Sequence, residues 1–156
     1  MNSLLQFSRL IDALNERIGR GIYWLILAAV LVSSINASVR KAFDMSSNAF
    51  LEMQWYMFSA VFLLGAGYTL LRQEHIRIDV IYGKFSRRTQ VWIDIFGTLF
   101  FLLPMCLIFL YLSWPFFLHS IQSGEISANA GGLILWPVKA LMPLGFLLLT
   151  LQGVSE

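Results

Sequence analysis

Four long apolar segments, separated by short polar stretches, dominate the pattern of hydrophobic positions along this chain. They cover residues 22–40, 52–71, 91–118 and 137–154, each to within a few positions. A helix needs about 20 mostly apolar residues to cross a bilayer, and each segment has about that length or more. The sequence therefore predicts an all-α membrane protein with four transmembrane helices, which form a single membrane domain over residues 1–156.

Residues 1–20 show a different pattern, in which apolar and charged side chains occupy opposite sides of a helical wheel. The apolar stripe comprises Leu4, Phe7, Ile11, Leu14 and Ile18. The charges between them are incompatible with a signal peptide. This pattern predicts an amphipathic helix in the membrane interface, and a cytoplasmic helix packed on another protein is the alternative. A second amphipathic interfacial helix is predicted in the central polar stretch, with Asp79 as its N-terminal cap.

Small side chains recur along the second apolar segment, at Ser59, Ala60, Gly65 and Gly67. Such residues allow helix backbones to approach closely in lipid, where apolar burial adds little driving force. We predict that they pack against a partner protein, and packing against the chain's own other helices is the alternative. In the third segment, Pro104 and Pro115 predict a bend, because proline removes a helical hydrogen bond.

Composition narrows the class of protein. The chain is 58% hydrophobic and 13% charged, whereas soluble domains carry about 25% charged residues. No basic stripe with interleaved aromatic residues is present, which argues against a nucleic-acid partner. The single cysteine, Cys106, cannot form an internal disulfide, and this excludes membrane thiol oxidoreductases that use paired cysteines. We expect Cys106 to be a small, buried apolar residue.

Lys and Arg residues are distributed unevenly between the two sides of the predicted membrane domain. Eight lie in the N-terminal region or between the second and third segments: Arg9, Arg17, Arg20, Arg72, Arg77, Lys84, Arg87 and Arg88. Three lie on the other side: Arg40, Lys41 and Lys139. Because cytoplasmic loops carry the excess of positive charge, both termini are predicted to be cytoplasmic.

The middle of each apolar segment contains no ionisable residue. Ionisable groups deep in a membrane usually mark substrate or ion pathways, and here they occur near the helix ends: Arg40, Glu52, Arg72, Asp94 and Lys139. His75 and His119 are predicted on opposite membrane faces, so they do not suit a haem site. No metal-ligand spacing, phosphate loop or nucleophile–base pair is recognisable. We therefore predict no catalytic, cofactor-binding or metal-binding residues, and a subunit that supports another protein rather than an enzyme.

Several pieces of the sequence, taken in order, resemble one family. Arg40 lies in VRKAF at the end of the first segment, and Glu52 opens the second. A small-residue stretch is followed by the block HIRID, from His75 to Asp79, and the last segment contains proline. This order resembles the small membrane subunit of tripartite ATP-independent periplasmic (TRAP) transporters, the DctQ-like family, over nearly the whole chain.

The resemblance implies two protein partners in a bacterial inner membrane system. A large membrane subunit would carry substrate and sodium, and a soluble periplasmic binding protein would deliver an organic acid. The small subunit would act as a scaffold with no transport site of its own. Sodium would bind the large subunit, no cofactor is expected here, and bound phospholipid is compatible with the charged edge.

Specific roles are expected for the polar residues near the membrane edges. Arg40 and Glu52 flank a short outward turn and are expected to form an ion pair, with two separately solvated charges as the alternative. Arg72, His75, Arg77 and Asp79 are expected to be structural, with Arg77 on a lipid phosphate or a carbonyl of the large subunit. Asn48 and Ser127, in the outward loops, are candidates for a weak contact with the binding protein.

Two other functions remain open at this point. One is a self-assembling small membrane channel or transporter. The other is an assembly or anchoring subunit of an unrelated membrane complex.

Overall fold

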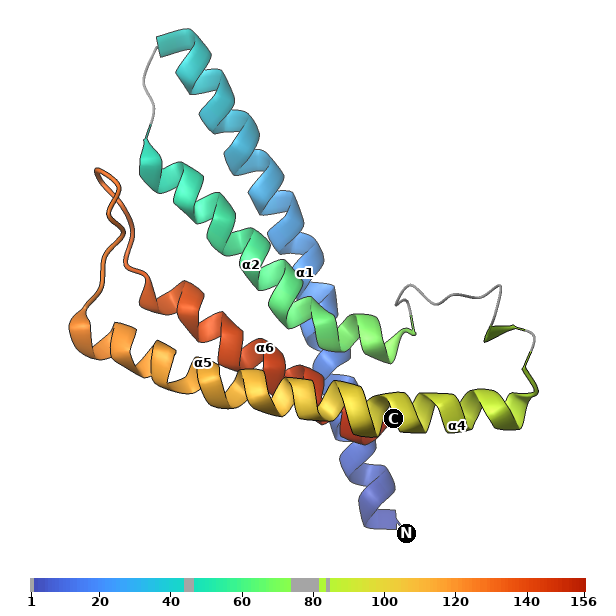
Figure 1. Cartoon of the computed structure of the whole chain (residues 1–156). Helices are drawn as coiled ribbons and strands as arrows, with labels where there is room; N and C mark the ends of the chain where they lie inside the picture. The colour runs from blue at the N-terminus through green and yellow to red at the C-terminus, as the bar shows by residue number, and fades with distance from the viewer. Residues whose placement is uncertain (1, 44–46, 74–81, 84) are drawn as a thin grey trace.

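The computed structural model describes residues 2–43, 47–73, 82–83 and 85–156, and helices make up most of them (Figure 1). The elements are α1 (Asn2–Phe43), α2 (Asn48–Leu71), α4 (Arg87–Gly97), a π-helical turn (Thr98–Leu102), α5 (Leu103–Ser123) and α6 (Trp136–Ser155). α4, the π turn and α5 follow one another without a break. In this described part of the chain, four helices are long and apolar enough to cross a membrane, which confirms the predicted all-α membrane fold.

α1 is one unbroken helix, although the sequence predicted an interfacial helix over 1–20 and a separate span over 22–40. At 1.5 Å per residue its 42 residues extend about 63 Å, roughly twice the hydrocarbon thickness of a bilayer. The predicted apolar stripe is divided between two environments. Ile11 is only 2% exposed and packs inside the chain, whereas Phe7 and Leu14 are exposed.

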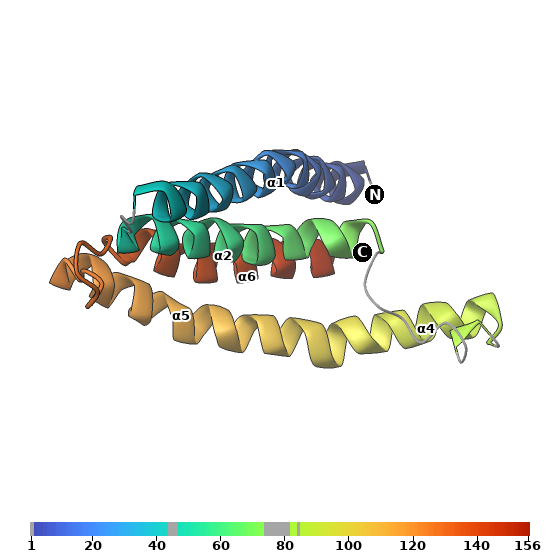
Figure 2. The ribbon, with the colours of Figure 1, turned by 90° about the horizontal axis from the view of Figure 1, so that it is seen from above.

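The helices form an open layer rather than a closed bundle (Figure 2). Their order across the layer is α1, α2, α6 and α5, so α6 lies between α2 and α5. We call the end of the layer that contains the C-terminal end of α2 and the C-terminal residues the inner end. α6 also contacts α1 there. α6 is therefore the central helix of the molecule.

Small residues set the spacing between the helices. A Cβ atom added to Gly145 of α6 would lie 2.6 Å from the Leu63 carbonyl oxygen of α2. A Cβ on Gly19 would lie 2.3 Å from the Tyr68 ring, which packs on the α1 backbone there. Substitution of Gly145 therefore forces α2 and α6 apart, and substitution of Gly19 requires the Tyr68 side chain to move.

The small residues of α2 are used mainly inside the chain. Ala60 and Gly67 are buried, and a Cβ on Gly67 would lie 2.5 Å from Asn15 Oδ1. Gly65 faces Ile22 of α1, and Ser59 is half-buried. Close helix contacts within the chain thus already occupy Ala60 and Gly67, whereas a partner surface that includes the half-buried Ser59 and Gly65 stays a prediction.

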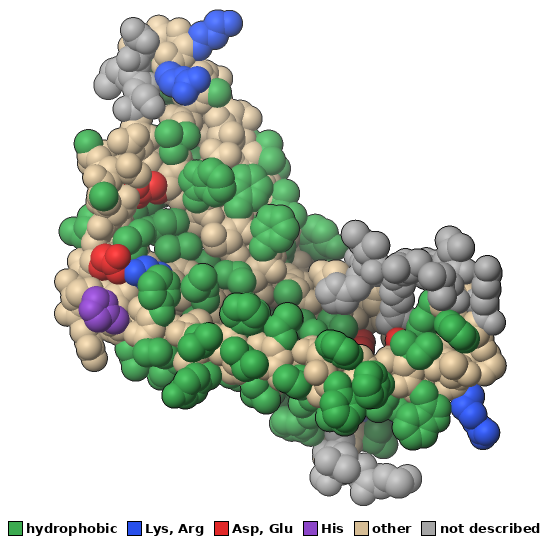
Figure 3. All heavy atoms as spheres, in the orientation of Figure 1, with side chains coloured by type: hydrophobic (Ala, Val, Ile, Leu, Met, Phe, Trp, Pro, Cys, Tyr) green, Lys and Arg blue, Asp and Glu red, His purple; other side chains and the backbone are tan. Residues whose placement is uncertain are grey.

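The apolar core is small and lies between α2, α5 and α6. Its centre is formed by Leu70, Cys106 and Leu149. Cys106 is fully buried and unpaired among the described residues, as expected for a small apolar residue. Green hydrophobic side chains cover much of the face shown in Figure 3, so most apolar side chains point outward.

The third span differs from a regular α-helix just before its first proline. The π turn over Thr98–Leu102 comes immediately before Leu103 and Pro104. Proline cannot donate the backbone hydrogen bond of a regular helix, and a π turn is a common way to accommodate a local disturbance. The helix then continues through Pro115 to Ser123.

Candidate functional site

The polar side chains gather in two clusters at opposite ends of α2, and these are the candidate functional sites. The outer cluster joins the first turns of α2 to the loop between α5 and α6. The inner cluster joins α1 to the end of α6. We call them the outer clasp and the inner network.

The outer clasp begins with three side chains spaced four residues apart on one face of α2, namely Asn48, Glu52 and Tyr56. The Asn48 amide donates to the Ala130 carbonyl at 3.1 Å, and the Tyr56 hydroxyl donates to the Ile134 carbonyl at 3.0 Å. Both acceptors belong to the loop over residues 124–135. The first turns of α2 therefore bind this loop along its length.

Glu52 is the centre of the outer clasp because its two oxygens accept three hydrogen bonds. Oε1 accepts from the Ser127 hydroxyl and from the Asn129 amide at 2.8 Å. Oε2 accepts from the Leu133 backbone N–H at 2.7 Å. Hydrogen bonds to a carboxylate are stronger than neutral ones, so this side chain is well suited to fix the loop conformation.

The structure brings together residues that the sequence assigned to separate roles. Asn48 and Ser127, expected to contact a binding protein, both take part in the outer clasp with Glu52. Glu52 does not form the expected ion pair with Arg40 in the described part of the chain, because the loop donors surround its carboxylate. Arg40 is instead exposed near the end of α1.

The loop itself is compact. Ile126 and Ile134 pair as an antiparallel β-bridge, and Gly124 and Gly131 adopt positive φ values of 61° and 72°. Glycine takes up this backbone region without steric cost. These features bring the backbone of residues 127–134 back toward α2, where the clasp forms.

An ion pair fixes the loop to the start of α6. The Lys139 ammonium contacts the Glu125 carboxylate and lies 4.1 Å from the centroid of the Phe116 ring. The hydrogen bond from Lys139 is the main cause of a lowered pKa of Glu125. Lys139 was expected at the entry of this span, and its partner in the loop was not foreseen.

The inner network links α1 and α6 through two buried amide groups and the half-buried Asp12 carboxylate. The Asn15 amide donates to Gln152 Oε1 at 2.8 Å, and the Gln152 amide donates to Asp12 Oδ1 at 3.0 Å. The Ser155 hydroxyl donates to the same Asp12 oxygen at 2.9 Å and contacts the Ser8 hydroxyl at 2.8 Å. Asn15 is 0% exposed and Gln152 1%, so this end of α6 is joined to α1 in a water-poor environment.

Sequence reasoning missed the inner network. The signal that could have revealed it is the spacing of Ser8, Asp12, Asn15 and Gly19, which places polar or small residues on one stripe of α1. Gln152 is the matching signal, because it is a strongly polar residue near the end of an apolar span. A polar stripe facing a polar residue on another helix predicts interhelical hydrogen bonds.

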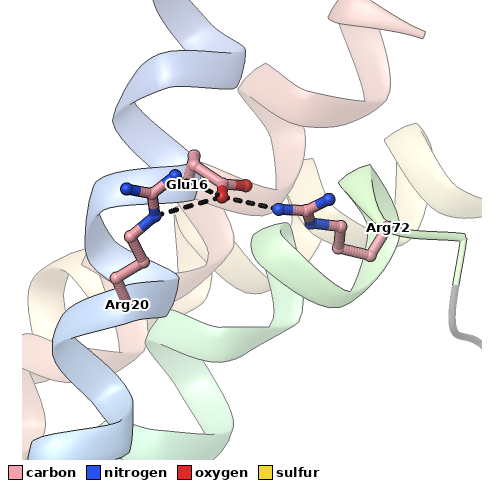
Figure 4. Close-up of polar contacts among 3 residues, drawn as sticks. All are labelled: Glu16, Arg20 and Arg72. Carbon is pink, nitrogen blue, oxygen red and sulfur yellow. Dashed lines mark hydrogen bonds and ion pairs between the residues drawn. The ribbon is translucent and has the colours of Figure 1, made fainter.

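Next to the inner network, Glu16 of α1 pairs with Arg72 at the end of α2 and with Arg20 of its own helix (Figure 4). Glu16 Oε1 accepts from Arg72 Nη2 at 2.6 Å and from Arg20 Nε at 3.2 Å. The Arg72 guanidinium also lies 5.4 Å from the Tyr68 ring centroid. The Tyr68 side chain and the charge of Glu16 raise the pKa of Arg72. Arg72 was expected to be structural, and the structure shows that it binds Glu16.

The other residues of the central charged block, His75, Arg77 and Asp79, lie outside the described residues. The same applies to most of the amphipathic helix predicted there. Among the residues that the structure describes, no group of three or more His, Cys, Asp and Glu side chains could hold a metal ion.

Comparison with known proteins identifies one family. The family model described as "Tripartite ATP-independent periplasmic transporters, DctQ component" matches residues 29–156. No curated protein matches the chain, and no solved structure matches it. The matched range begins within α1 and includes the whole outer clasp and the α6 half of the inner network.

Proposed function

Because the chain belongs to the DctQ family of TRAP transporter components, we propose that it is a scaffold for a large transport subunit. In this role it transports nothing by itself. The large subunit carries the substrate together with sodium, and a periplasmic binding protein delivers the substrate, an organic acid with a carboxylate. The assembly lies in the inner membrane of a bacterium.

The observation that carries this proposal is the open layer of helices. At most 33% of the residues in the apolar window of any span are buried within the chain, and in the Arg87–Ser123 helix only 6% are buried. An isolated bundle would bury more of its surface against itself. A layer with both faces open is suited to lie against a larger membrane protein and to hold part of it in place.

The positions of the charges support the absence of a transport site. The middle of each span lacks Asp, Glu, Lys, Arg and His. The polar groups instead form the outer clasp and the inner network, in which they bind one another and fix helices and loops. Side chains used in this way stabilise a rigid scaffold, while a coupled transporter needs ionisable or polar groups along its pathway.

The excess of Lys and Arg supports an orientation in which the inner network faces the cytoplasm. The outer clasp then faces the periplasm, where the binding protein docks. Because Glu52 holds the loop over 124–135 in one conformation, this loop offers a pre-organised but small surface. We infer that the large subunit supplies most of the docking area.

Reconstitution in liposomes tests the proposal. The purified chain alone should show no uptake of organic acids under a sodium gradient. Together with the large membrane subunit and the matching binding protein, it should support sodium-dependent uptake. Accumulation by the chain alone, above that of empty vesicles, would show that it is a transporter in its own right. Full uptake by the large subunit without this chain would contradict the scaffold role.

Orientation can be tested separately with a cysteine-free background made by Cys106→Ser. A cysteine in the outer loop, Ala128→Cys, should react with a membrane-impermeant maleimide added from the periplasmic side. A cysteine at the start of α4, Arg88→Cys, should react only after the membrane is opened. The opposite labelling pattern would reverse the proposed topology.

A further inference from the structure

The first turns of α1 carry an exposed surface that neither the outer clasp nor the inner network uses. Ser8 contacts Ser155 at the end of α6, so the turns before Ser8 extend past that helix (Figure 1). The family match begins at residue 29 and does not include this part of α1. We call residues 5–20 the inner segment of α1.

One flank of the inner segment is apolar. Phe7, Leu10 and Leu14 follow one another at intervals of three and four residues, so they lie on one side of the helix. Their exposed fractions are 52%, 66% and 40%. From Leu14 the same line continues at steps of seven residues through Gly21 to Ala28, within the apolar span. The apolar flank therefore leads into the membrane without a polar interruption.

The neighbouring flank of the inner segment is basic. Arg9, Arg17 and Arg20 are exposed there. Both acidic side chains of the segment are already bound, because Asp12 accepts from α6 and Glu16 accepts from two arginines. Among the residues that the structure describes, Arg9 and Arg17 form no ion pair. Their guanidinium groups are therefore available to anions outside the chain.

The length of α1 allows the apolar flank to reach lipid. Its 42 residues extend about 63 Å, roughly twice the thickness of the hydrocarbon core. A helix of this length that crosses the bilayer at an angle leaves it gradually, so one flank still contacts acyl chains where the other flank has reached the headgroups. With the apolar flank toward the acyl chains, Arg9 and Arg17 lie at the level of the phosphates.

From this arrangement we infer that the inner segment of α1 binds the surface of a membrane that contains anionic phospholipids. Phe7, Leu10 and Leu14 insert at the boundary between headgroups and acyl chains, and Arg9 and Arg17 bind the phosphates. A zwitterionic lipid attracts these arginines less, because its own cation balances its phosphate. A soluble acidic protein would match the basic flank, but not an apolar flank that continues into the span. This inference does not depend on the transport function.

Site-directed spin labelling of the full-length chain tests the inference, in the cysteine-free background Cys106→Ser. A nitroxide is attached at Leu10→Cys on the apolar flank or, as the matched control, at Ala13→Cys, an exposed position on the basic flank. In vesicles of phosphatidylcholine and phosphatidylglycerol, the label at position 10 should be protected from a water-soluble nickel complex and accessible to oxygen. The label at position 13 should be accessible to nickel.

In vesicles of phosphatidylcholine alone, the protection at position 10 should be weaker. Equal nickel accessibility at positions 10 and 13 in the anionic vesicles would overturn the inference. Equal protection of position 10 in both kinds of vesicle would also overturn it, because the binding would then not depend on the headgroup.

The contribution of charge is tested with the label at position 10 retained. Arg9→Gln and Arg17→Gln should each lower the ratio of protected to exposed label about fivefold in the anionic vesicles, the factor per cation near an anionic surface. Added salt should lower the ratio as well, because it screens the same attraction. Arg40→Gln, exposed near the other end of α1, should leave the ratio unchanged. An equal decrease in the Arg40 variant would contradict the assigned surface.

Circular dichroism should show the same helical content for the three arginine variants, because each substituted side chain is exposed. If one variant of the inner segment fails to fold, the other decides the question. Protection of position 10 that appears only after addition of the large membrane subunit would assign this surface to a protein partner and overturn the inference.

Discussion

At the outer end of α2 a carboxylate fixes a loop, while near its inner end a carboxylate fixes a helix. Glu52 accepts hydrogen bonds from Ser127, Asn129 and Leu133 in a partly exposed position. Asp12 accepts from Gln152 and Ser155 beside fully buried amide groups. A carboxylate is the acceptor in both regions. The outer clasp is partly open to water and fixes a loop, whereas the inner network is largely buried and joins two helices.

This difference determines how far a local change spreads. When a loop hydrogen bond breaks in contact with water, water replaces the lost partner, and the neighbouring helices keep their positions. When a buried partner is removed, the remaining groups lose both protein and water partners, which costs about 1–3 kcal/mol per group. We therefore expect the outer clasp to control local order and the inner network to control the assembly of the helices.

The largest loss of stability is expected at the contact between α2 and α6, because the outer clasp and the inner network both depend on it. Gly145→Ala places a Cβ 2.6 Å from the Leu63 carbonyl oxygen, a backbone atom that cannot rotate away. α2 and α6 must separate, and the free energy of unfolding should fall by about 2–3 kcal/mol. Unfolding in detergent, followed by circular dichroism, measures the loss. Gly97→Ala is the matched control, because its Cβ meets nothing within 4 Å. Equal stability of the two variants would contradict the close contact.

A smaller but still global effect is expected from Gln152→Leu. The change removes the acceptor of the Asn15 amide and one of the two hydrogen bonds that Asp12 accepts from α6. It should destabilise the fold by about 2 kcal/mol. Amide hydrogen exchange should rise in both α1 and α6. Gln122→Leu removes an amide at an exposed position of α5 and serves as the control. Increased exchange confined to the last turn of α6 would mean that the network does not join the helices.

Glu52→Gln should have a mainly local effect. The substituted amide presents N–H groups to donors of the loop, so residues 124–135 should lose their fixed conformation. Because three hydrogen bonds to a carboxylate are weakened, limited proteolysis within this loop should become about tenfold faster. Global unfolding should change less than in Gln152→Leu. Arg40→Gln should leave the rate of loop proteolysis unchanged. An equal increase in that variant would indicate that Arg40 and Glu52 form an ion pair.

The smallest expected effect is a pH dependence of the loop at Glu125. Its pKa in the folded chain lies below the ordinary value of 4.5, chiefly because of the hydrogen bond from Lys139. A group with a lowered folded pKa contributes its full stabilisation above the ordinary value and loses it as the pH falls through the folded pKa. The fluorescence of Trp136, which follows the loop, reports on the loop conformation. It should be constant from about pH 7 to about pH 5, above the usual pKa range of glutamate, and should change at more acidic pH. Glu125→Gln should reduce that acidic change, and the part that remains should come from Glu52, which accepts three hydrogen bonds from the same loop.

The spans could be predicted from sequence because apolarity is a local property. Segments expected over 52–71 and 137–154 correspond to α2 (Asn48–Leu71) and α6 (Trp136–Ser155). The continuity of α1 was missed, because a run of charges beside an apolar segment was interpreted as a change of direction. Helical hydrogen bonds continue through such a run when neither proline nor another break interrupts it.

The neighbour that each helix face contacts could not be predicted from the sequence in the same way. In a membrane, lipid and protein neighbours are both apolar, so a stripe of small or apolar side chains does not indicate which of them it contacts. This is why Gly67 was assigned to a partner although it packs against Asn15. The partners of Glu52 were hidden for another reason, because they depend on how a loop about 80 residues later folds back onto α2, which no local pattern specifies.

The central place of α6 also has a consequence for biosynthesis. α6 follows α5 along the chain, yet it separates α5 from α2 in the layer. When the ribosome has delivered α1, α2 and α5 to the membrane, the first pair can already pack, but α5 still lacks the neighbour along which it lies. The arrival of α6 fills the space between them and allows Gln152 to meet Asn15. Insertion of this one helix is therefore the step that turns separately inserted segments into a single layer.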